Sequence, residues 1–366
     1  MLEDAELFAW LRLLAVPGLG RQNARRLLAT FGGPEQVFDA TTAALREVVA
    51  VPLAEALALP SEGWAAQREA TRRWLDGEGR SIVPLGHPEY PPQLLQTPDP
   101  PLLLYLQGRQ ELLHARSIAI VGSRQATPQG VANARAFASH FSSAGLAVVS
   151  GLALGIDGAA HEGGLEGPGS TIAVVATGLD RVYPKRHLAL AHRIAVHGLL
   201  ISELPLDTPP LRQNFPSRNR IIAGLALGTL VVEAAPDSGS LITARQAVEM
   251  GREIFAIPGS IHAPQSRGCH WLIKQGAKLV DRAEDVLEEL RLAEPRLAAA
   301  STETARGPDN KDPVLSALGH DPVTLDALVA RTGWPADQLN VRLLELELEG
   351  QLVRLPGGLF QRRVAV

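Results

Sequence analysis

The chain has 366 residues, of which 46% are hydrophobic and 4% aromatic, and its formal net charge is −4 at pH 7. This length predicts two or three domains, and the net charge excludes a uniformly basic coat for nucleic acid. The single cysteine, Cys269, excludes an internal disulfide framework and a cysteine-rich zinc site. The acidic start lacks a signal peptide, and no apolar run is long enough to span a membrane. We therefore expect a cytoplasmic protein without membrane contact.

Residues 1–80 are predicted to form a helical domain of the SAM or helix-hairpin-helix type. The first helix has apolar residues at i, i+3, i+4 and i+7, namely Leu7, Trp10, Leu11 and Leu14. A VPGLG turn at 16–20 and a basic helix over 21–30 follow. Such a hairpin either grips a DNA phosphate through its N–H groups or is a plain turn between two helices. Three arginines favour a contact with DNA or protein: Arg21, Arg25 and Arg26.

Residues 81–290 are predicted to form an α/β domain with a doubly wound, Rossmann-like parallel sheet. The proline-rich segment 81–115 indicates an extended connector that delivers one strand. Six apolar strands follow, at Ile118–Val121, Leu146–Ser150, Thr171–Ala176, Leu199–Ser202, Thr229–Glu233 and Ile254–Ile257. The helices between them are expected at Gly130–Ser143, Gly158–Leu165, His187–Val196, Arg218–Leu225 and Leu241–Met250. Apolar strands alternating with helices are typical of a parallel sheet covered on both faces.

Polar residues follow these strands at their carboxyl ends, where open α/β sheets bind ligands. Gly122-Ser123-Arg124 follows the first strand, and Ser238-Gly239-Ser240 opens the helix after the fifth. Between Thr171 and Gly228, seven basic residues face three acidic ones. Only four of the 35 Lys and Arg residues of the chain are lysines, and arginine suits bidentate phosphate contacts. This edge of the sheet is predicted to bind an anion.

The stretch from Phe215 to Ala244 concentrates these features. Ser217 is expected to cap a helix whose first turn contains Arg218 and Arg220. Cations are unfavourable at a helix N-terminus, so an anionic ligand is expected to complete the site. The start of the next helix offers backbone N–H groups and hydroxyls to the same anion. Together these features favour a phosphate site over an ordinary turn with solvated arginines.

Four further polar residues lie at this edge: Asp157, His161, Glu203 and Glu233. They would suit general acid–base chemistry on a nucleotide, or they orient the arginines, which is the interpretation that we favour. No lysine has a Walker A context and no G-x-G-x-x-G follows the first strand. The sequence therefore predicts no cofactor, and it shows no metal site.

Residues 291–312 are predicted to form a linker and residues 313–366 a winged-helix domain. Helices are expected at Val314–Leu318, Leu325–Arg331 and Pro335–Gly350, followed by a hairpin of Leu352–Leu355 and Leu359–Arg362. The third helix carries Glu345, Glu347 and Glu349, which makes a poor face for a phosphate backbone. Protein contact or packing is the expected role of this domain.

Several strings in order resemble the DNA-processing protein A (DprA/Smf) family over about residues 85–280. They are Tyr90-Pro91-Pro92, AIVGSR (119–124), SGLALGIDGAAH (150–161), GLD and YP (178–184), ISELP (201–205), FPSRNRIIAGL (215–225) and SGSLITA (238–244). The resemblance implies an extended Rossmann fold and a protein that is not an enzyme. It also implies that the protein binds single-stranded DNA, protects it from nucleases, and loads the RecA recombinase onto it during natural transformation. The implied homodimer forms through the Rossmann domain, near Leu272–Val280.

Carried over position by position, the family's motifs implicate Arg124 of GSR, Lys185 after the YP pair, and the run Arg218, Asn219 and Arg220. The predicted anion edge adds Gly122, Ser123, Phe215, Ser238, Gly239 and Ser240, with Phe215 as a stacking platform for a base. A competing hypothesis is a Rossmann-type nucleotide N-ribohydrolase in which Glu233 is the acid–base group. The chain has APDSGSLITA where such enzymes have a PGG-x-GT run.

Overall fold

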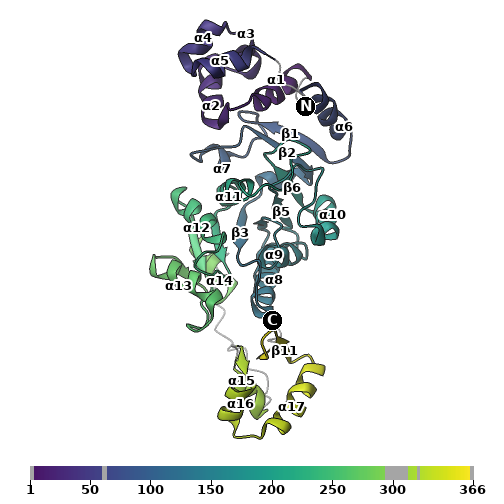
Figure 1. Ribbon diagram of the computed structural model, residues 1–366, viewed down its shortest axis with the longest axis vertical. Helices are drawn as coiled ribbons and strands as arrows, with labels where there is room; N and C mark the ends of the chain where they lie inside the picture. The colour runs from purple at the N-terminus through teal and green to yellow at the C-terminus, as the bar shows by residue number, and fades with distance from the viewer. Residues whose placement is uncertain (1–3, 60–63, 293–311, 320–321, 363–366) are drawn as a thin grey trace.

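The computed structural model describes residues 4–59, 64–292, 312–319 and 322–362. A helical N-terminal unit, a long α/β unit and a small C-terminal unit follow one another along the longest axis (Figure 1). The N-terminal helices are α1 (Asp4–Ala15), α2 (Gly20–Phe31), α3 (Pro34–Asp39), α4 (Thr42–Val48), α5 (Val51–Ala58) and α6 (Trp64–Leu75). The predicted helices on either side of the VPGLG turn are thus present as α1 and α2.

The turn between α1 and α2 faces the α/β unit. Gly18 and Gly20 adopt φ of 74° and 60°, which a residue with a side chain rarely does. Leu19, between them, is buried, and it belongs to one hydrophobic core with Leu103 and Tyr105 of the sheet. The N-terminal unit therefore packs on the sheet through the hairpin that could otherwise have gripped a phosphate.

A single sheet of nine strands forms the centre of the molecule, in the order β1-β2-β6-β5-β4-β3-β7-β8-β9. The strands from β6 to β9 in this order are parallel, whereas β1 and β2 pair antiparallel at one edge. The strands are β1 (Arg80–Pro84), β2 (Leu103–Gly108), β3 (Ser117–Val121), β4 (Ala147–Ser150), β5 (Thr171–Val174), β6 (Leu199–Ser202), β7 (Gly228–Val231), β8 (Glu253–Ala256) and β9 (Lys278–Leu279).

The doubly wound sheet is confirmed, but it is mixed rather than wholly parallel. The proline-rich connector supplies two strands instead of one. Its prolines lie between β1 and β2, around the short helix α7 (Pro92–Leu95), so they interrupt neither strand except at the last residue of β1. The strand β9 was not predicted, because two residues carry no recognisable alternation.

Helices cover both faces of the sheet (Figure 1). Alternate residues of β3 enter different cores: Ala119 and Val121 pack beneath α11 and α12, and Ile118 and Ile120 beneath α8 and α9. This two-sided burial explains the continuous apolar strands. The helices are α8 (Pro128–Ser143), α9 (Ile156–Gly164), α10 (Leu188–His197), α11 (Asn214–Leu225), α12 (Ser240–Glu249), α13 (Arg267–Lys274) and α14 (Ala283–Glu289).

The C-terminal unit is a winged helix, as predicted. It consists of α15 (Pro313–Leu318), β10 (Val323–Thr324), α16 (Leu325–Thr332), α17 (Ala336–Leu348), β11 (Leu352–Leu355) and β12 (Leu359–Arg362). The short strand β10, which was not predicted, pairs with β12. Among the described residues, no helix has the length and apolar character to cross a bilayer.

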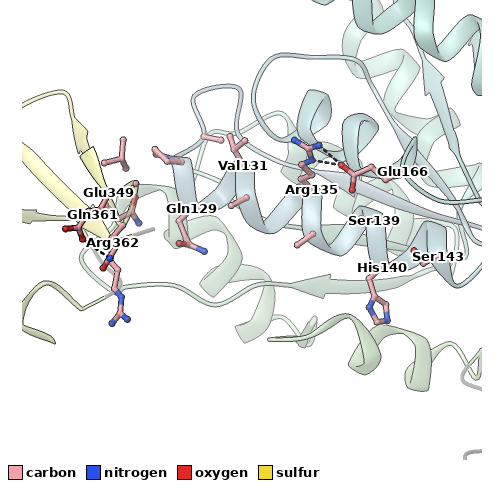
Figure 2. A pocket seen from close by; sticks show the side chains of 17 residues that line it. Gln129, Val131, Arg135, Ser139, His140, Ser143, Glu166, Glu349, Gln361 and Arg362 are labelled. Carbon is pink, nitrogen blue, oxygen red and sulfur yellow. Dashed lines mark hydrogen bonds and ion pairs between the residues drawn. The ribbon is translucent and has the colours of Figure 1, made fainter. Parts of the chain in front are cut away.

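A cavity of about 1160 Å³ lies between α8 and the β11–β12 hairpin of the winged helix (Figure 2). Arg135 and Glu166, which line it, bind each other, with the Arg135 Nε 2.7 Å from a Glu166 carboxylate oxygen. None of the predicted site residues lines this cavity.

Candidate functional site

The predicted site residues gather in a cleft of about 800 Å³ at the carboxyl ends of β3 and β7. These strands are neighbours in the sheet although β4, β5 and β6 lie between them in the chain. A chain that winds outward in both directions leaves a crevice at such a switch point. The topology therefore opens this cleft between the loop after β3 and the loop after β7.

Nine of the eleven predicted residues line the cleft: Gly122, Ser123, Arg124, Phe215, Arg218, Asn219, Ser238, Gly239 and Ser240. The other two, Lys185 and Arg220, do not. Lys185 is exposed in a 3-10 turn, two residues after Tyr183 of the cleft. Arg220 is buried on the opposite side of α11.

The helix α11 begins four residues earlier than predicted, at Asn214. Ser217 is therefore inside the helix and is not its cap, and Arg218 and Arg220 lie in the second turn. Two positions along a helix correspond to a rotation of about 200°. Arg218 and Arg220 consequently point in nearly opposite directions and have different partners.

Arg218 lies beneath the cleft and is only 4% exposed. Its guanidinium donates a 2.7 Å hydrogen bond to the backbone carbonyl of Val174 at the end of β5. The Arg218 Nε has no hydrogen-bond partner among the described residues. Burial lowers the pKa of Arg218 to about 10, so it remains a cation at neutral pH.

Gly151 makes room for this guanidinium. A Cβ at Gly151 would lie 1.7 Å from an Arg218 terminal nitrogen. Because the Val174 carbonyl fixes the guanidinium from the other side, it could not retreat easily. The glycine after β4 is thus a steric requirement of the buried arginine.

The loop after β4 is held by the two buried polar residues of α9, Asp157 and His161. The Asp157 carboxylate accepts hydrogen bonds from the N–H groups of Gly151 and Ala153, at 3.1 and 3.3 Å. Burial raises the pKa of Asp157, and the adjacent charge of Arg218 opposes this shift. Asp157 thus orients both the loop and the arginine.

His161 has a partner for each ring nitrogen. Its Nε2 accepts from the Leu152 N–H at 3.2 Å, which assigns the proton to Nδ1, 2.7 Å from the Thr171 hydroxyl. Leu152 has φ of 58°, which is uncommon for a residue with a side chain. Burial lowers the pKa of His161 to about 3. His161 is therefore neutral and structural, not an acid–base group.

Arg220 belongs to a network between domains. It forms a buried ion pair with Glu203, which follows β6, and donates to the backbone carbonyl of Asp99 at 2.6 Å. Arg21 of α2 reaches the same place, with its Nε 2.8 Å from the Asp99 carboxylate and a terminal nitrogen 3.2 Å from the Ser217 hydroxyl. Arg25 also pairs with Asp99. The basic face of α2 thus contacts the protein's own α/β unit.

The mouth of the cleft is aromatic. The rings of Phe215 and Tyr183 have centroids 5.7 Å apart, and the Arg124 guanidinium lies 5.2 Å from the centroid of Phe215. Sequence reasoning did not assign Tyr183 and Arg212 to the site, yet both line the cleft. The YP motif and the basic excess of this segment were the signals for them.

The SGS turn at the start of α12 forms the opposite wall. The N–H groups of Ser240 and Leu241 donate to the hydroxyl and to the backbone carbonyl of Ser238, respectively. The prediction that they are free to bind an anion is therefore wrong. The Gly239 N–H has no partner among the described residues, and the Asn219 amide donates to the Gly239 carbonyl at 3.4 Å. The Ser238 and Ser240 hydroxyls are hydrogen-bonded to each other at 2.7 Å, so one backbone donor and one hydroxyl proton remain for an anion.

Glu233 is turned away from the cleft. Its carboxylate accepts from the Thr127 N–H at 2.9 Å and from the Thr127 hydroxyl at 2.6 Å. A side chain at Gly130 would clash with this carboxylate, because a Cβ there would lie 2.4 Å from the carboxylate carbon. Glu233 stabilises the start of α8, and the ribohydrolase hypothesis loses its proposed acid–base group.

The charges of the cleft favour an anion. Arg124, Arg212 and Arg218 line it together with Asp157 and Asp237. Asp157 is buried against Arg218 and Asp237 is exposed. The cleft is a positively charged groove with an aromatic rim, and it has no acid–base pair aimed at a substrate among its described residues.

Comparisons with known proteins match two family models to this chain. The family model of DNA recombination-mediator protein A matches residues 81–291, and that of the DprA winged helix domain matches residues 295–358. The chain is 39% identical to Protein Smf of Escherichia coli, over 99% of this chain and 97% of that protein. It is 48% identical to the DNA processing protein DprA of Streptococcus pneumoniae, over 55% of this chain and 71% of that one.

Two solved structures have a similar fold. The DNA processing protein A of Streptococcus pneumoniae superposes with a TM-score of 0.62 and 36% identity, covering 79% of this chain and 98% of that one. The Helicobacter pylori protein, solved for its single-stranded DNA binding mode, has a TM-score of 0.53 and 29% identity, covering 58% of this chain and 95% of that one.

Fold and cleft together define a Rossmann-type protein with a positively charged groove, a helical N-terminal domain and a winged helix. More specifically, the chain belongs to the DNA recombination-mediator protein A family, also called DprA or Smf.

Proposed function

We propose that this protein binds single-stranded DNA in the cleft between β3 and β7. The observation that carries the proposal is the arrangement of Arg124, Phe215 and Tyr183 above the buried Arg218. Arginines take phosphates, and exposed aromatic rings stack on unpaired bases. A duplex hides the faces of its bases, so this groove favours a single strand.

Contacts with phosphates and with the faces of bases do not distinguish one base from another, so we expect binding with little preference for DNA sequence. Arg124, Arg212 and Arg218 would bind phosphates, and the Gly239 N–H with the Ser238 and Ser240 hydroxyls would complete the wall. The free Nε of Arg218 is a buried donor that a phosphate oxygen would satisfy. Arg220 has a positioning role in this proposal because Glu203 and Asp99 occupy its guanidinium.

The wider role that we propose is that of a mediator of recombination in the cytoplasm, without enzymatic activity, which protects incoming single strands and delivers them to RecA in natural transformation. Membership of the family and the single-stranded DNA binding of the Helicobacter pylori protein support it. The engagement of Glu233 by Thr127 supports a binding role over nucleotide hydrolysis.

We further propose a homodimer that forms through the Rossmann domain near Leu272–Val280. The strand β9 ends the sheet, and Leu279 is 48% exposed there. An edge strand with exposed apolar side chains is a natural pairing surface. Sedimentation of the full chain should give the mass of two protomers.

Fluorescence anisotropy of a labelled oligothymidylate tests the binding proposal. Arg124 is exposed, so Arg124→Ala should fold normally. We expect its affinity to fall about tenfold and the slope of log affinity against log salt to decrease by about 0.7, the value of one lost phosphate contact. Unlabelled duplex should compete poorly.

Arg26→Ala is the matched control. Arg26 is an exposed arginine of α2 whose side chain has no hydrogen-bond or ion-pair partner among the described residues. It should bind like the wild type. Equal losses in both variants would show a non-specific charge effect and would refute the cleft as the binding site.

A further inference from the structure

A second depression adjoins the cleft, between α12 and α13. It has a volume of about 560 Å³, and its walls include Leu241 and Arg245 of α12 and Arg267 and Trp271 of α13. Each pair is spaced i and i+4, so it occupies one face of its helix. Figure 1 shows the two helices next to each other, beside the sheet.

The depression shares a rim with the cleft. Asp237, Ser238 and Ile242 line both hollows. Ile242 is 40% exposed on this rim. A chain that leaves the cleft over the SGS turn therefore enters the depression directly.

The arginines of the depression are exposed, whereas Arg218 beneath the cleft is buried. Arg245 and Arg267 are exposed, and neither guanidinium has a hydrogen-bond or ion-pair partner in the part of the chain that the structure describes. Asp237 is the one carboxylate among the described lining residues, which leaves the depression with a net positive charge. Two unpaired guanidinium groups in one hollow suit a phosphodiester.

Trp271 supplies the apolar surface. It is 47% exposed, and Leu241 and Ile242 line the hollow with it. A large exposed ring beside free arginines is the combination that single-strand grooves use, because every base has a face that can stack. The charge complementarity and the shared rim both indicate a polynucleotide as the occupant.

We propose that the depression between α12 and α13 is a second single-stranded DNA subsite, which binds the nucleotides of the same strand beyond those in the cleft. Arg245 and Arg267 take a phosphate, and a base stacks on Trp271. The inference rests on the proposed function of the cleft. It adds a direction: the strand passes from Phe215 across Ser238 toward α13.

Probes of two lengths test it. An oligothymidylate of about four nucleotides fills the cleft alone, and one of about sixteen reaches the depression. For the Arg245→Ala/Arg267→Ala variant we expect unchanged affinity for the short probe and a loss of about tenfold for the long one, with a salt slope lower by about 0.7, the value of the one phosphate that the two arginines share. Trp271→Ala should also lose about tenfold for the long probe only, and Trp271→Phe should recover most of it.

The control removes two exposed arginines of the N-terminal helices, Arg26→Ala/Arg72→Ala, and should change neither affinity. Equal long-to-short affinity ratios in the wild type and the α12–α13 variants would overturn the subsite. If those variants instead changed the sedimentation mass with the ratios intact, the hollow would be a contact between copies of this chain. Failure of the wild type to bind either probe would refute the function of the cleft itself.

Discussion

Two helices of this molecule carry charged residues to opposite effect. In α11, Arg218 and Arg220 are buried, and each is fixed by an acceptor at the end of a strand. In α17, the third helix of the winged domain, Arg342 is bound by Asp312, Glu345 and Glu349. The first arrangement places cations under a groove, and the second cancels a cation on an acidic surface.

The remaining surface of α17 strengthens the contrast. Val341, Leu344 and Leu348 are 61%, 57% and 81% exposed and lie on one face of the helix. A winged helix in which this helix read DNA would present basic and polar groups there. Two units of one family protein thus differ in what their surfaces can bind, which the fold alone does not reveal.

The largest effect is expected from breaking the buried pair beneath α11. Glu203→Ala removes the buried carboxylate partner of Arg220 and leaves it the partly exposed Asp99 carboxylate, 3.3 Å from its Nε. We expect a loss of about 3 kcal/mol in the free energy of unfolding. Glu345→Ala removes a half-exposed partner of Arg342 and should cost under about 1 kcal/mol. Urea unfolding of the two variants measures the difference, and equal losses would contradict the assigned roles of the two helices.

The aromatic rim comes next. Phe215→Ala removes the ring that stands between Tyr183 and Arg124. We expect single-stranded DNA affinity to fall by about 1–3 kcal/mol, the usual contribution of one stacked base. Phe215→Tyr keeps a ring and should bind nearly as well. An unchanged affinity in Phe215→Ala would remove stacking from the account of the cleft.

A smaller effect concerns the loop beneath the cleft. His161 has its pKa lowered to about 3 in the folded protein, against 6.5 for an ordinary histidine. The unfolded chain therefore binds the extra proton between these values, so this histidine reduces stability as pH falls below about 6.5, by at most about 1.4 kcal/mol per pH unit. His161→Gln should show a shallower decline of the unfolding free energy between pH 6.5 and 4.5. Parallel pH profiles would show that His161 is not buried as described.

The sequence predicted much of this arrangement because its signals were local. Strands such as Ile118–Val121 are short apolar runs between glycine turns, and the polar residues after them had to meet at one edge. Arg218 and Arg220 could be assigned to that edge together, but not separated. Their partners, Val174, Glu203 and Asp99, come from distant parts of the chain, and the helix start at Asn214 fixes which arginine faces the cleft.

The hairpin arginines show the same limit. Arg21 and Arg25 indicated a contact with DNA or protein, and the partner is Asp99 in the proline-rich connector of the same chain. Nothing in the local sequence pairs residues 78 and 74 positions apart. Tyr183 was similarly separated from Phe215 in sequence although the two rings meet at the cleft.

The smallest effect is expected in the most direct measurement, a single binding assay that compares the cleft with α17. Salt-dependent anisotropy with a labelled single strand would be measured for the wild type, Arg124→Ala, and an α17 variant with Val341, Leu344 and Leu348 changed to serine. We predict a weakened affinity and a lower salt slope for Arg124→Ala, and values equal to the wild type for the α17 variant. The reverse pattern, with Arg124→Ala unchanged and the α17 variant weakened, would contradict the assignment of DNA binding to the cleft.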